Sequence, residues 1–396
     1  MKELNDQETG EIQWFRLNER SREYCPLILP ENLIFERFKL QNTARQILQN
    51  APHPRGKDSQ WRVIFCLRCL LKTAPYVAVM LSEKFSKAHY KNLITCGSVW
   101  TCSCCASKIS SRRADEISIA GNVHVEAGGA MYMLTYTFSH SRQDLLIGLL
   151  GSRESRRGLL GALYRFRYSR AYKNLFDFYG VVGFIRALEV TKSYANGWHP
   201  HVHELLFFTR ALSESELRAF KNKLFELWYQ ACFRSSLALP NRKYGVDIVR
   251  AHSPAEYLQK IGREQKWGAG AELTRSHVKR SRDREGMTPF DLLRIAGENQ
   301  GFSGYEAKSF IEYATAFYGA RQCVWSRGLK AAFGIGELSD EEIAAREDDK
   351  AQLIMTIEPE LWRRVIKADP SNRAAMLRMA ETGGRSALEC FLSGFC

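Results

Sequence analysis

The sequence has no uninterrupted apolar run of the length that a membrane-spanning helix needs. Its longest apolar stretches are broken by Arg, Glu or Gly well before the roughly 20 residues that cross a bilayer. The first ten residues are polar and acidic, so they also lack the basic start and apolar centre of a secretory signal. Internal repeats and low-complexity tracts are absent as well. We therefore expect a soluble, cytoplasmic, globular protein without a membrane partner.

What the sequence does have is length, apolar content and positive charge. With 396 residues, 45% of them hydrophobic, the chain can bury a sizeable core, and its length suggests a main domain with smaller additions. The formal net charge is +14, which favours an acidic partner such as nucleic acid. Beyond Gly336 acidic residues outnumber basic ones, so the positive charge belongs to the body of the protein.

Local patterns of strands and helices predict an α+β protein in four segments. The segments are a loosely attached leader over 1–60, a cysteine-rich probable zinc unit and helix over 61–120, a main domain over 121–335, and a mostly helical extension over 336–396. In the main domain, strand-like runs cover 130–138, 183–191 and 199–208, basic amphipathic helix covers 145–178, and a capped helix begins after Ser213.

Three histidines at alternate positions mark one of these strands. They are His199, His201 and His203. The period of two places their side chains on one face of a strand, so His201 and His203 can ligate one ion. The loop before them contains Asn196-Gly197, a pair favoured in hairpin turns, and antiparallel pairing with 183–191 brings Glu189 close to the histidines.

This mixed set of nitrogen and oxygen donors allows three interpretations. With open coordination positions it suits Mg²⁺ or Mn²⁺ that holds a phosphate and polarises a scissile phosphodiester. Two histidines and a glutamate also suit the zinc of a hydrolase. Without a metal, the histidines are ordinary strand residues that find hydrogen-bond partners. The alternation of three histidines opposite a glutamate favours a metal site.

The cysteines indicate a second metal site. There are eleven, an odd number, and more than half lie between Cys66 and Cys105, which fits metal ligands in a reducing cytoplasm better than disulfides. Two Cys-x-x-Cys pairs have the spacing that lets two thiolates reach one tetrahedral zinc. We predict as zinc ligands Cys66, Cys69, Cys102 and Cys105, with Cys96 and Cys104 also available. The alternative is a group of buried free thiols.

A tyrosine and a basic segment follow the hairpin. Tyr257 and Lys260 are three residues apart and share one face of the helix expected after Pro254, so the lysine can steady a phenolate or a phosphate oxygen. The alternative is that Tyr257 is an ordinary packing residue of this helix, without a chemical role. The basic segment beyond it contains Trp267, which can stack on a base, but acidic residues are interspersed, so a solvated loop is the alternative. Its candidate DNA-binding residues are Lys266, Arg275, Lys279, Arg280 and Arg282.

Taken in order, these motifs resemble the Rep proteins of rolling-circle plasmids, within the HUH endonucleases named for His-hydrophobe-His. The segment 96–109 resembles the cysteine signature of that family, and 132–137 resembles its first strand motif. The metal motif is matched by 188–191 and 196–203, and the motif of the nicking tyrosine by 256–260. Further similar segments are 272–275, 288–293 and 325–330.

The resemblance implies a central antiparallel sheet of about five strands flanked by helices, with the two motif strands central. It implies that His201 and His203 bind a divalent cation, Mg²⁺ or Mn²⁺, with Glu189 or His199 as a further ligand. Tyr257 would nick one strand of the plasmid double-strand origin, leaving a 5′-phosphotyrosine and a free 3′-OH primer. Implied partners in a bacterial cytoplasm are origin and single-stranded DNA, host helicase, single-strand binding protein and DNA polymerase.

Two positions depart from patterns seen in some relatives. A glutamate that activates the terminating water stands four residues before the tyrosine in those proteins, where this chain has Ser253. A second tyrosine follows the lysine in others, where this chain has Ile261. Termination by water or by a second transesterification therefore stays open. Two other functions are a zinc-stabilised DNA-binding regulator without catalysis and a related HUH transposase or relaxase.

Overall fold

A five-stranded antiparallel sheet forms the centre of the computed structural model, which describes residues 2–5, 12–17, 24–26, 33–83, 86–251, 286–346 and 350–395. Its strands, in spatial order, are β10 (Cys323–Trp325), β7 (Val181–Ser193), β8 (Gly197–Phe208), β6 (Ala130–Tyr136) and β9 (Val246–Ala251). Every pairing between neighbours is antiparallel. The α+β class and the five-stranded antiparallel sheet predicted from the sequence are confirmed.

The β7–β8 hairpin carries the histidine run. Its register places Glu189 opposite His201 and Ala187 opposite His203. Gly197 has a φ of 75° at the turn, where glycine has no steric penalty, and a Cβ there would lie 2.9 Å from the backbone of Arg142. The predicted antiparallel hairpin is therefore confirmed, and its turn needs the glycine for two reasons.

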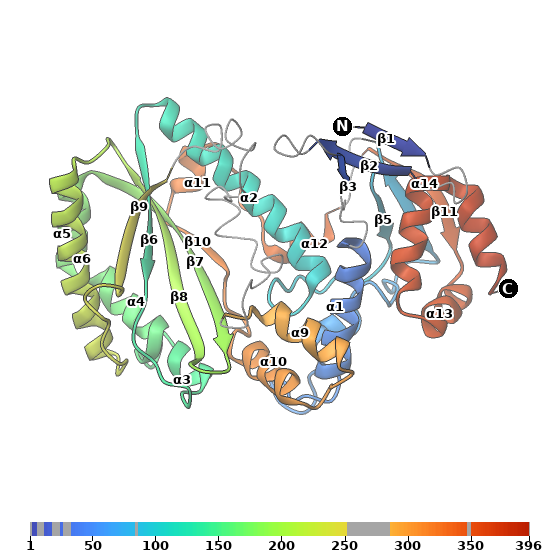
Figure 1. Cartoon of the computed structure of the whole chain (residues 1–396), viewed down its shortest axis with the longest axis horizontal. Coiled ribbons are helices and arrows are strands. Elements are labelled where there is room, and N and C mark those ends of the chain that lie inside the picture. Colours follow the sequence, from blue (N-terminus) through green and yellow to red (C-terminus); the bar gives the residue numbers. More distant parts are fainter. Residues whose placement is uncertain are drawn as a thin grey trace.

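The two faces of this sheet are covered by different helices, as Figure 1 shows. One face packs against α3 (Leu146–Leu150), α4 (Gly158–Tyr168), α5 (Arg170–Tyr179) and α6 (Glu214–Arg234). The other packs against α2 (Ser103–Glu126) and α11 (Leu329–Ala332), where Ile117 and Leu329 meet Leu205. Because side chains alternate along a strand, His201 and His203 share the second face with Leu205.

A second sheet joins segments from opposite ends of the chain. It has the order β11 (Ala351–Ile357), β4 (Val77–Ser82), β5 (Ala88–Lys91), all antiparallel. Helices α13 (Pro359–Ala368) and α14 (Asn372–Ser393) pack on it through a separate core that contains Val79, Trp362 and Leu377. The cysteine-rich region and the C-terminal region therefore form one structural unit.

Smaller elements connect the two sheets. They are α1 (Leu33–Leu48), the 3₁₀-helix η1 (Arg62–Ile64), α9 (Pro289–Glu298), α10 (Tyr305–Ala316) and α12 (Asp340–Ala345). Three short strands at the N-terminus, β1 (Lys2–Asn5), β2 (Ile12–Leu17) and β3 (Tyr24–Pro26), pair as a separate antiparallel sheet. None of the helices described is long and apolar enough to span a membrane.

One prediction about the ends of the chain needs correction. The loosely attached leader over 1–60 contains α1, whose Ala44 and Leu48 are fully buried. The prolines behind that prediction, at 52 and 54, follow the end of α1 and so do not interrupt it. The segment 336–396 contains the helices α12, α13 and α14 together with β11, whose pairing with β4 leaves no local signal in the sequence.

Candidate metal centres

The hairpin brings a carboxylate and two imidazoles together on the sheet face opposite α3–α6. Glu189 Oε2 lies 3.0 Å from His203 Nε2 and 3.4 Å from His201 Nε2. Potential ligand atoms of these three residues lie within 4.8 Å of one another. Their side chains are 11–13% exposed, so a ligand can reach them from outside.

Hydrogen bonds on the far side of each ring orient these histidines. His201 Nδ1 lies 3.2 Å from the carbonyl oxygen of His199, which only accepts, so Nδ1 is the donor of this contact and Nε2 faces Glu189. His203 Nδ1 lies 3.1 Å from Thr135 Oγ1 on the neighbouring strand β6. Such partners fix ring orientation in metal sites and increase the basicity of the ligating nitrogen.

His199, the other candidate ligand, contacts His140 and lies beside the group. Its Nδ1 lies 2.7 Å from His140 Nε2, and it is not part of the Glu189–His201–His203 group. Burial, followed by the neighbouring His201 and His140, lowers the pKa of His199 to about 4, so its ring is neutral at physiological pH. Of the two less certain ligands, the geometry favours Glu189 over His199.

The donor set fits a divalent cation. Two neutral imidazoles and a carboxylate supply one negative charge and leave coordination positions for substrate oxygens or water. On the same face, Val249 of β9 is 53% exposed, so the elements described here leave this part of the sheet accessible. The site therefore has the donors and the opening that a phosphate-binding metal centre needs.

Four cysteine thiols form a second, closed cluster. The residues are Cys66, Cys96, Cys102 and Cys105, all buried. The Sγ atoms of Cys66 and Cys105 are 3.5 Å apart, those of Cys96 and Cys105 are 3.6 Å apart, and those of Cys102 and Cys66 are 3.7 Å apart. Tetrahedral zinc with bonds of about 2.3 Å separates its sulfurs by about 3.8 Å. The cluster therefore has the dimensions of a structural zinc site.

One predicted zinc ligand is corrected by this geometry. Cys69 is exposed and lies outside the cluster, and Cys96 takes its place. Leu67 and Gly97, which directly follow Cys66 and Cys96, have φ values of 48° and 66°. This left-handed conformation bends the chain directly after Cys66 and directly after Cys96. The glycine after Cys96 was the available signal, since glycine adopts this conformation without strain.

Polar groups surround the thiols. Although burial opposes charge on Cys102, hydrogen bonds from neighbouring thiols lower the pKa of Cys102 well below its usual value. Gln41 Nε2 lies 3.8 Å from Cys102 Sγ, and Arg373 Nη1 donates to Gln41 Oε1 at 2.6 Å. Arg373 is fully buried and comes from α14. Sequence analysis missed Arg373, because no spacing connects it with the cysteines.

Several predicted residues cannot be placed relative to these centres. The proposed nucleophile Tyr257 and its neighbour Lys260 lie outside the described residues. The same holds for the candidate DNA-binding residues Lys266, Arg275, Lys279, Arg280 and Arg282. Their roles remain predictions. Thr135 and His140, which contact the histidine run, were not predicted, because the sequence does not say which segments lie beside β8.

Comparison with known proteins identifies two similar proteins, both from Streptomyces. The chain is 26% identical over 296 residues to "Protein rep" of Streptomyces lividans, an alignment that covers 61% of this chain and 64% of that protein. It is 29% identical over 132 residues to "Neomycin resistance protein" of Streptomyces cyanogenus, which covers 29% of this chain and 30% of that protein. No family model and no solved structure matches. The similarity to a protein named rep agrees with the resemblance that the motifs indicated.

Proposed function

We propose that this protein initiates plasmid replication by the rolling-circle mechanism, as a metal-dependent nickase of the HUH type that cuts one strand of the double-strand origin. The observation that carries the proposal is the group of Glu189, His201 and His203 on an accessible face of an antiparallel sheet. The similarity to a Rep protein supports the same biological setting. The chain spans just under two thirds of that relative, so the activity of the whole protein belongs to the proposal.

In the proposed reaction, the phenolate oxygen of Tyr257 attacks the phosphorus of the scissile phosphodiester. The bond from phosphorus to the 3′ oxygen breaks, and that oxygen takes up a proton, which balances the one lost by the phenol. The products are a 5′-phosphotyrosine and a free 3′-OH that host polymerase can extend, with helicase and single-strand binding protein acting on the displaced strand. Lys260 steadies the phenolate or a phosphate oxygen.

Residues of the hairpin prepare the site for this reaction. His201 and His203 direct Nε2 towards Glu189, and their Nδ1 partners hold both rings in place. These nitrogens and Glu189 would hold a divalent cation, whose positive charge would polarise the scissile phosphate and stabilise charge as the bond breaks. Glu189 orients both rings through its Oε2 atom.

Chain length is compatible with Tyr257 as the nucleophile. Strand β9 ends at Ala251, which pairs with Met131, four residues from Thr135 beside the histidines. Four residues of a strand cover about 14 Å. Six residues, from Ala251 to Tyr257, can span up to about 20 Å. The chain can therefore return Tyr257 to the hairpin group, which supports the assignment.

The cysteine cluster contributes stability in this proposal and takes no part in the chemistry. All four thiols are buried, and four thiolates fill the coordination of a tetrahedral zinc, so no position is left for substrate. A zinc in this position would fasten the start of α2 to the segments that contain Cys66 and Cys96. Metal binding at such sites contributes directly to folding.

Covalent capture of DNA tests the proposed reaction. Labelled oligonucleotides that tile the DNA next to the gene are incubated with the protein and Mn²⁺, and denaturing gels report protein-linked DNA. We expect an adduct that Tyr257→Phe abolishes, and that Tyr244→Phe, at a 63% exposed tyrosine, leaves intact. An adduct of undiminished yield in Tyr257→Phe would assign the nucleophile elsewhere.

Replacing the histidines separates catalysis from binding. We expect His201→Ala and His203→Ala to reduce nicking by more than the about 10- to 100-fold loss typical of changes outside the ligand shell, while DNA affinity persists. His89→Gln, on β5 of the second sheet, is the matched control. If the wild-type protein binds DNA but never nicks the tiled oligonucleotides or supercoiled plasmid, the protein is a DNA-binding regulator and the nickase proposal is wrong.

A further inference from the structure

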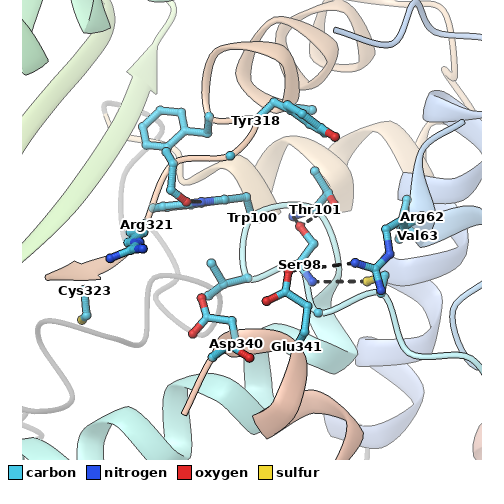
Figure 2. A pocket seen from close by; sticks show the side chains of 18 of the residues that line it. Arg62, Val63, Ser98, Trp100, Thr101, Tyr318, Arg321, Cys323, Asp340 and Glu341 are labelled. Carbon is cyan, nitrogen blue, oxygen red and sulfur yellow. Dashed lines mark hydrogen bonds and ion pairs between the residues drawn. The ribbon is translucent and has the colours of Figure 1, made fainter. Parts of the chain in front are cut away.

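A cavity of about 820 Å³ lies beside the cysteine cluster, with Cys96 in its lining. Its walls come from the loop before η1, the turn after Cys96, the end of α10, strand β10 and the start of α12. Figure 2 shows Arg321 and Arg62 on opposite sides, Tyr318 at the top, and Asp340 and Glu341 at the bottom. Ligand pockets in proteins measure about 300–1,000 Å³, so the cavity can hold a nucleotide-sized group.

Aromatic rings form one wall of this cavity. His53, Trp61 and Tyr318 meet edge to face, with ring centroids 4.9–5.8 Å apart and interplanar angles of 70–84°. Trp61 is 4% exposed, whereas Tyr318 is 38% exposed. In each pair the edge of one ring lies against the face of the other, and Tyr318 is the ring that keeps an exposed part. Tyr318 therefore offers a stacking surface to a flat ligand.

Two indole groups in the cavity wall lack hydrogen-bond partners. Among the described residues, Trp61 Nε1 and Trp325 Nε1 are buried donors without an acceptor. Buried donors in native proteins nearly always have a partner, and an indole nitrogen can only donate. Both nitrogens are themselves shielded from solvent, so the indoles contribute to the wall of the cavity and not to its accessible polar surface.

The charges of the cavity favour a neutral base flanked by phosphates. Arg55 lies with its guanidinium 5.6 Å from the centre of the Tyr318 ring, and neither Arg55 nor Arg321 has an ion pair within the described chain. Asp340 and Glu341 line the floor, where they disfavour a bare anion and accept hydrogen bonds from amino groups. A base therefore fits the interior and its phosphates fit the arginines at the rim.

Strand β10, which forms part of the cavity wall, pairs with the hairpin strand that carries Glu189. Strand β10 pairs with β7 so that Cys323 faces Ala187, and Leu188 N donates to Gln322 O at 3.2 Å. The segment that leads from the cavity wall into β10 thus runs beside β7 next to Glu189. A strand bound at the hairpin can place a neighbouring nucleotide in the cavity.

We propose that this cavity binds one unstacked base of single-stranded DNA, with Tyr318 as the stacking platform and Arg55 and Arg321 on the adjoining phosphates. The proposal rests on the proposed function, because it makes the cavity a subsite for the strand that is nicked. It adds a residue-level account of how that strand is held. No motif of the sequence pointed to Tyr318 or Arg55.

Photochemical crosslinking tests the base contact directly. The probe is (dC)12 with one 5-iododeoxycytidine, bound to the full-length wild-type protein in EDTA and irradiated. Iodinated bases crosslink to aromatic side chains on which they stack, so we expect the modified peptide to contain Tyr318 or His53. Crosslinks found only in peptides that do not line the cavity would overturn the proposal. This measurement needs no variant and so does not depend on how variants fold.

Affinity measurements test the stacking contribution of the ring. By fluorescence polarisation with labelled (dC)12 in EDTA, Tyr318→Ala should weaken binding roughly 5- to 150-fold, the range expected when one stacked base is lost. Tyr318→Phe keeps the ring and should bind like the wild type. Phe178→Ala removes an 81% exposed ring on α5 and should also leave affinity unchanged. Equal affinities for Tyr318→Ala and wild type contradict the proposal.

These tests fail separately from those of the nickase. EDTA removes divalent cations, so crosslinking and affinity report strand binding without cleavage. If Tyr318→Ala binds normally while His201→Ala abolishes nicking, the base pocket is wrong and the nickase proposal stands. If the Tyr318 crosslink forms while no nicking occurs in any condition, the pocket stands and the nickase proposal is wrong.

Discussion

At the scale of single residues, Cys96 is held in the cysteine cluster by the turn that follows it. Gly97 has a φ of 66°, and a Cβ on it would lie 2.8 Å from Cγ of Glu341 in α12. The backbone N–H of Ser98 donates to Cys96 Sγ at 3.5 Å. This turn directs Cys96 Sγ to a position 3.6 Å from Cys105 Sγ. Cys69 has no comparable position, since its side chain is exposed.

Exchange of single cysteines should therefore have opposite outcomes at Cys96 and Cys69. We expect Cys96→Ser to lose bound zinc and to lower the melting temperature, because a hydroxyl is a poor replacement for a thiolate ligand of zinc. Cys69→Ser should retain both zinc content and melting temperature. Elemental analysis of the purified variants and thermal unfolding measure the two quantities. Loss of zinc in Cys69→Ser with retention in Cys96→Ser would restore the ligand set predicted from sequence spacing.

The histidine group was predictable from the sequence to a greater extent than the cysteine cluster. The alternation of the histidines and the Asn196-Gly197 turn specify a hairpin in which Glu189 faces His201, because register follows from the turn. The choice between Cys69 and Cys96 depends on how distant loops fold together. Spacing alone cannot decide it, because both residues lie within reach of the other thiols along the chain.

At the scale of elements, the start of α6 is fixed by a capping box. Ser213 Oγ accepts from the backbone N–H of Glu216, and the Glu216 carboxylate accepts from the backbone N–H of Ser213 at 2.8 Å. Arg210 Nη2 adds a contact of 2.7 Å to Glu216. The helix that follows buries Phe220 and Trp228 against the main sheet. The sequence predicted this start, because the serine and glutamate have the required spacing.

The stability that Glu216 contributes should depend on pH. A hydrogen bond from Arg210, followed by hydrogen bonds from Ser213, lowers the pKa of Glu216 from 4.5 to about 2. A carboxyl whose pKa is lowered by folding stabilises the protein above its unfolded pKa and loses that effect as pH falls through the folded pKa. The difference in melting temperature between wild type and Glu216→Gln should be constant from pH 5 to neutrality and shrink as pH falls from about 4.5 towards 2.

The control for this measurement is Glu214→Gln, in the same helical turn. Its side chain is 93% exposed and makes one ion pair, with Arg218 at 3.5 Å, so the expected effect on melting temperature is small at every pH. A difference for Glu216→Gln that persists unchanged at pH 3, or that is no larger than that of Glu214→Gln at neutral pH, would contradict the role assigned to the carboxylate.

At the scale of the whole molecule, the two ends of the chain meet at the cysteine cluster. Strand β11 pairs with β4, and α14 delivers Arg373 to Gln41 of α1 and to the carbonyl oxygen of Leu67. Sequence patterns predicted most helices and strands of the main sheet, because their turns and caps are local. They did not predict that β11 pairs with β4, because a strand of alternating side chains carries no information about its partner.

Arg373 links the C-terminal helix to the charge of the zinc site. Burial lowers the pKa of its guanidinium, and the neighbouring Cys104, Cys66 and Cys102 oppose that shift. Among the described residues its Nη2 atom is buried without a hydrogen-bond partner. Four thiolates around Zn²⁺ carry a net charge of about −2. A buried cation beside them is favourable when zinc is bound, and costs desolvation energy without an equal return when it is absent.

Removal of this cation should therefore act more strongly on the zinc-bound protein than on the metal-free one. We expect Arg373→Met, which keeps the length and loses the charge, to weaken zinc binding about 10- to 100-fold, as changes beside a ligand shell do. The melting temperature should fall more with zinc than after chelation, because the charge is favourable beside the loaded site, whereas the hydrogen bonds to Gln41 and Leu67 are lost in both forms. Competition with a chromogenic chelator and thermal unfolding measure these effects, with Arg363→Met at an exposed arginine of α13 as control. Equal zinc affinities for wild type and Arg373→Met would show that the C-terminal helix docks on the cluster without influencing its metal.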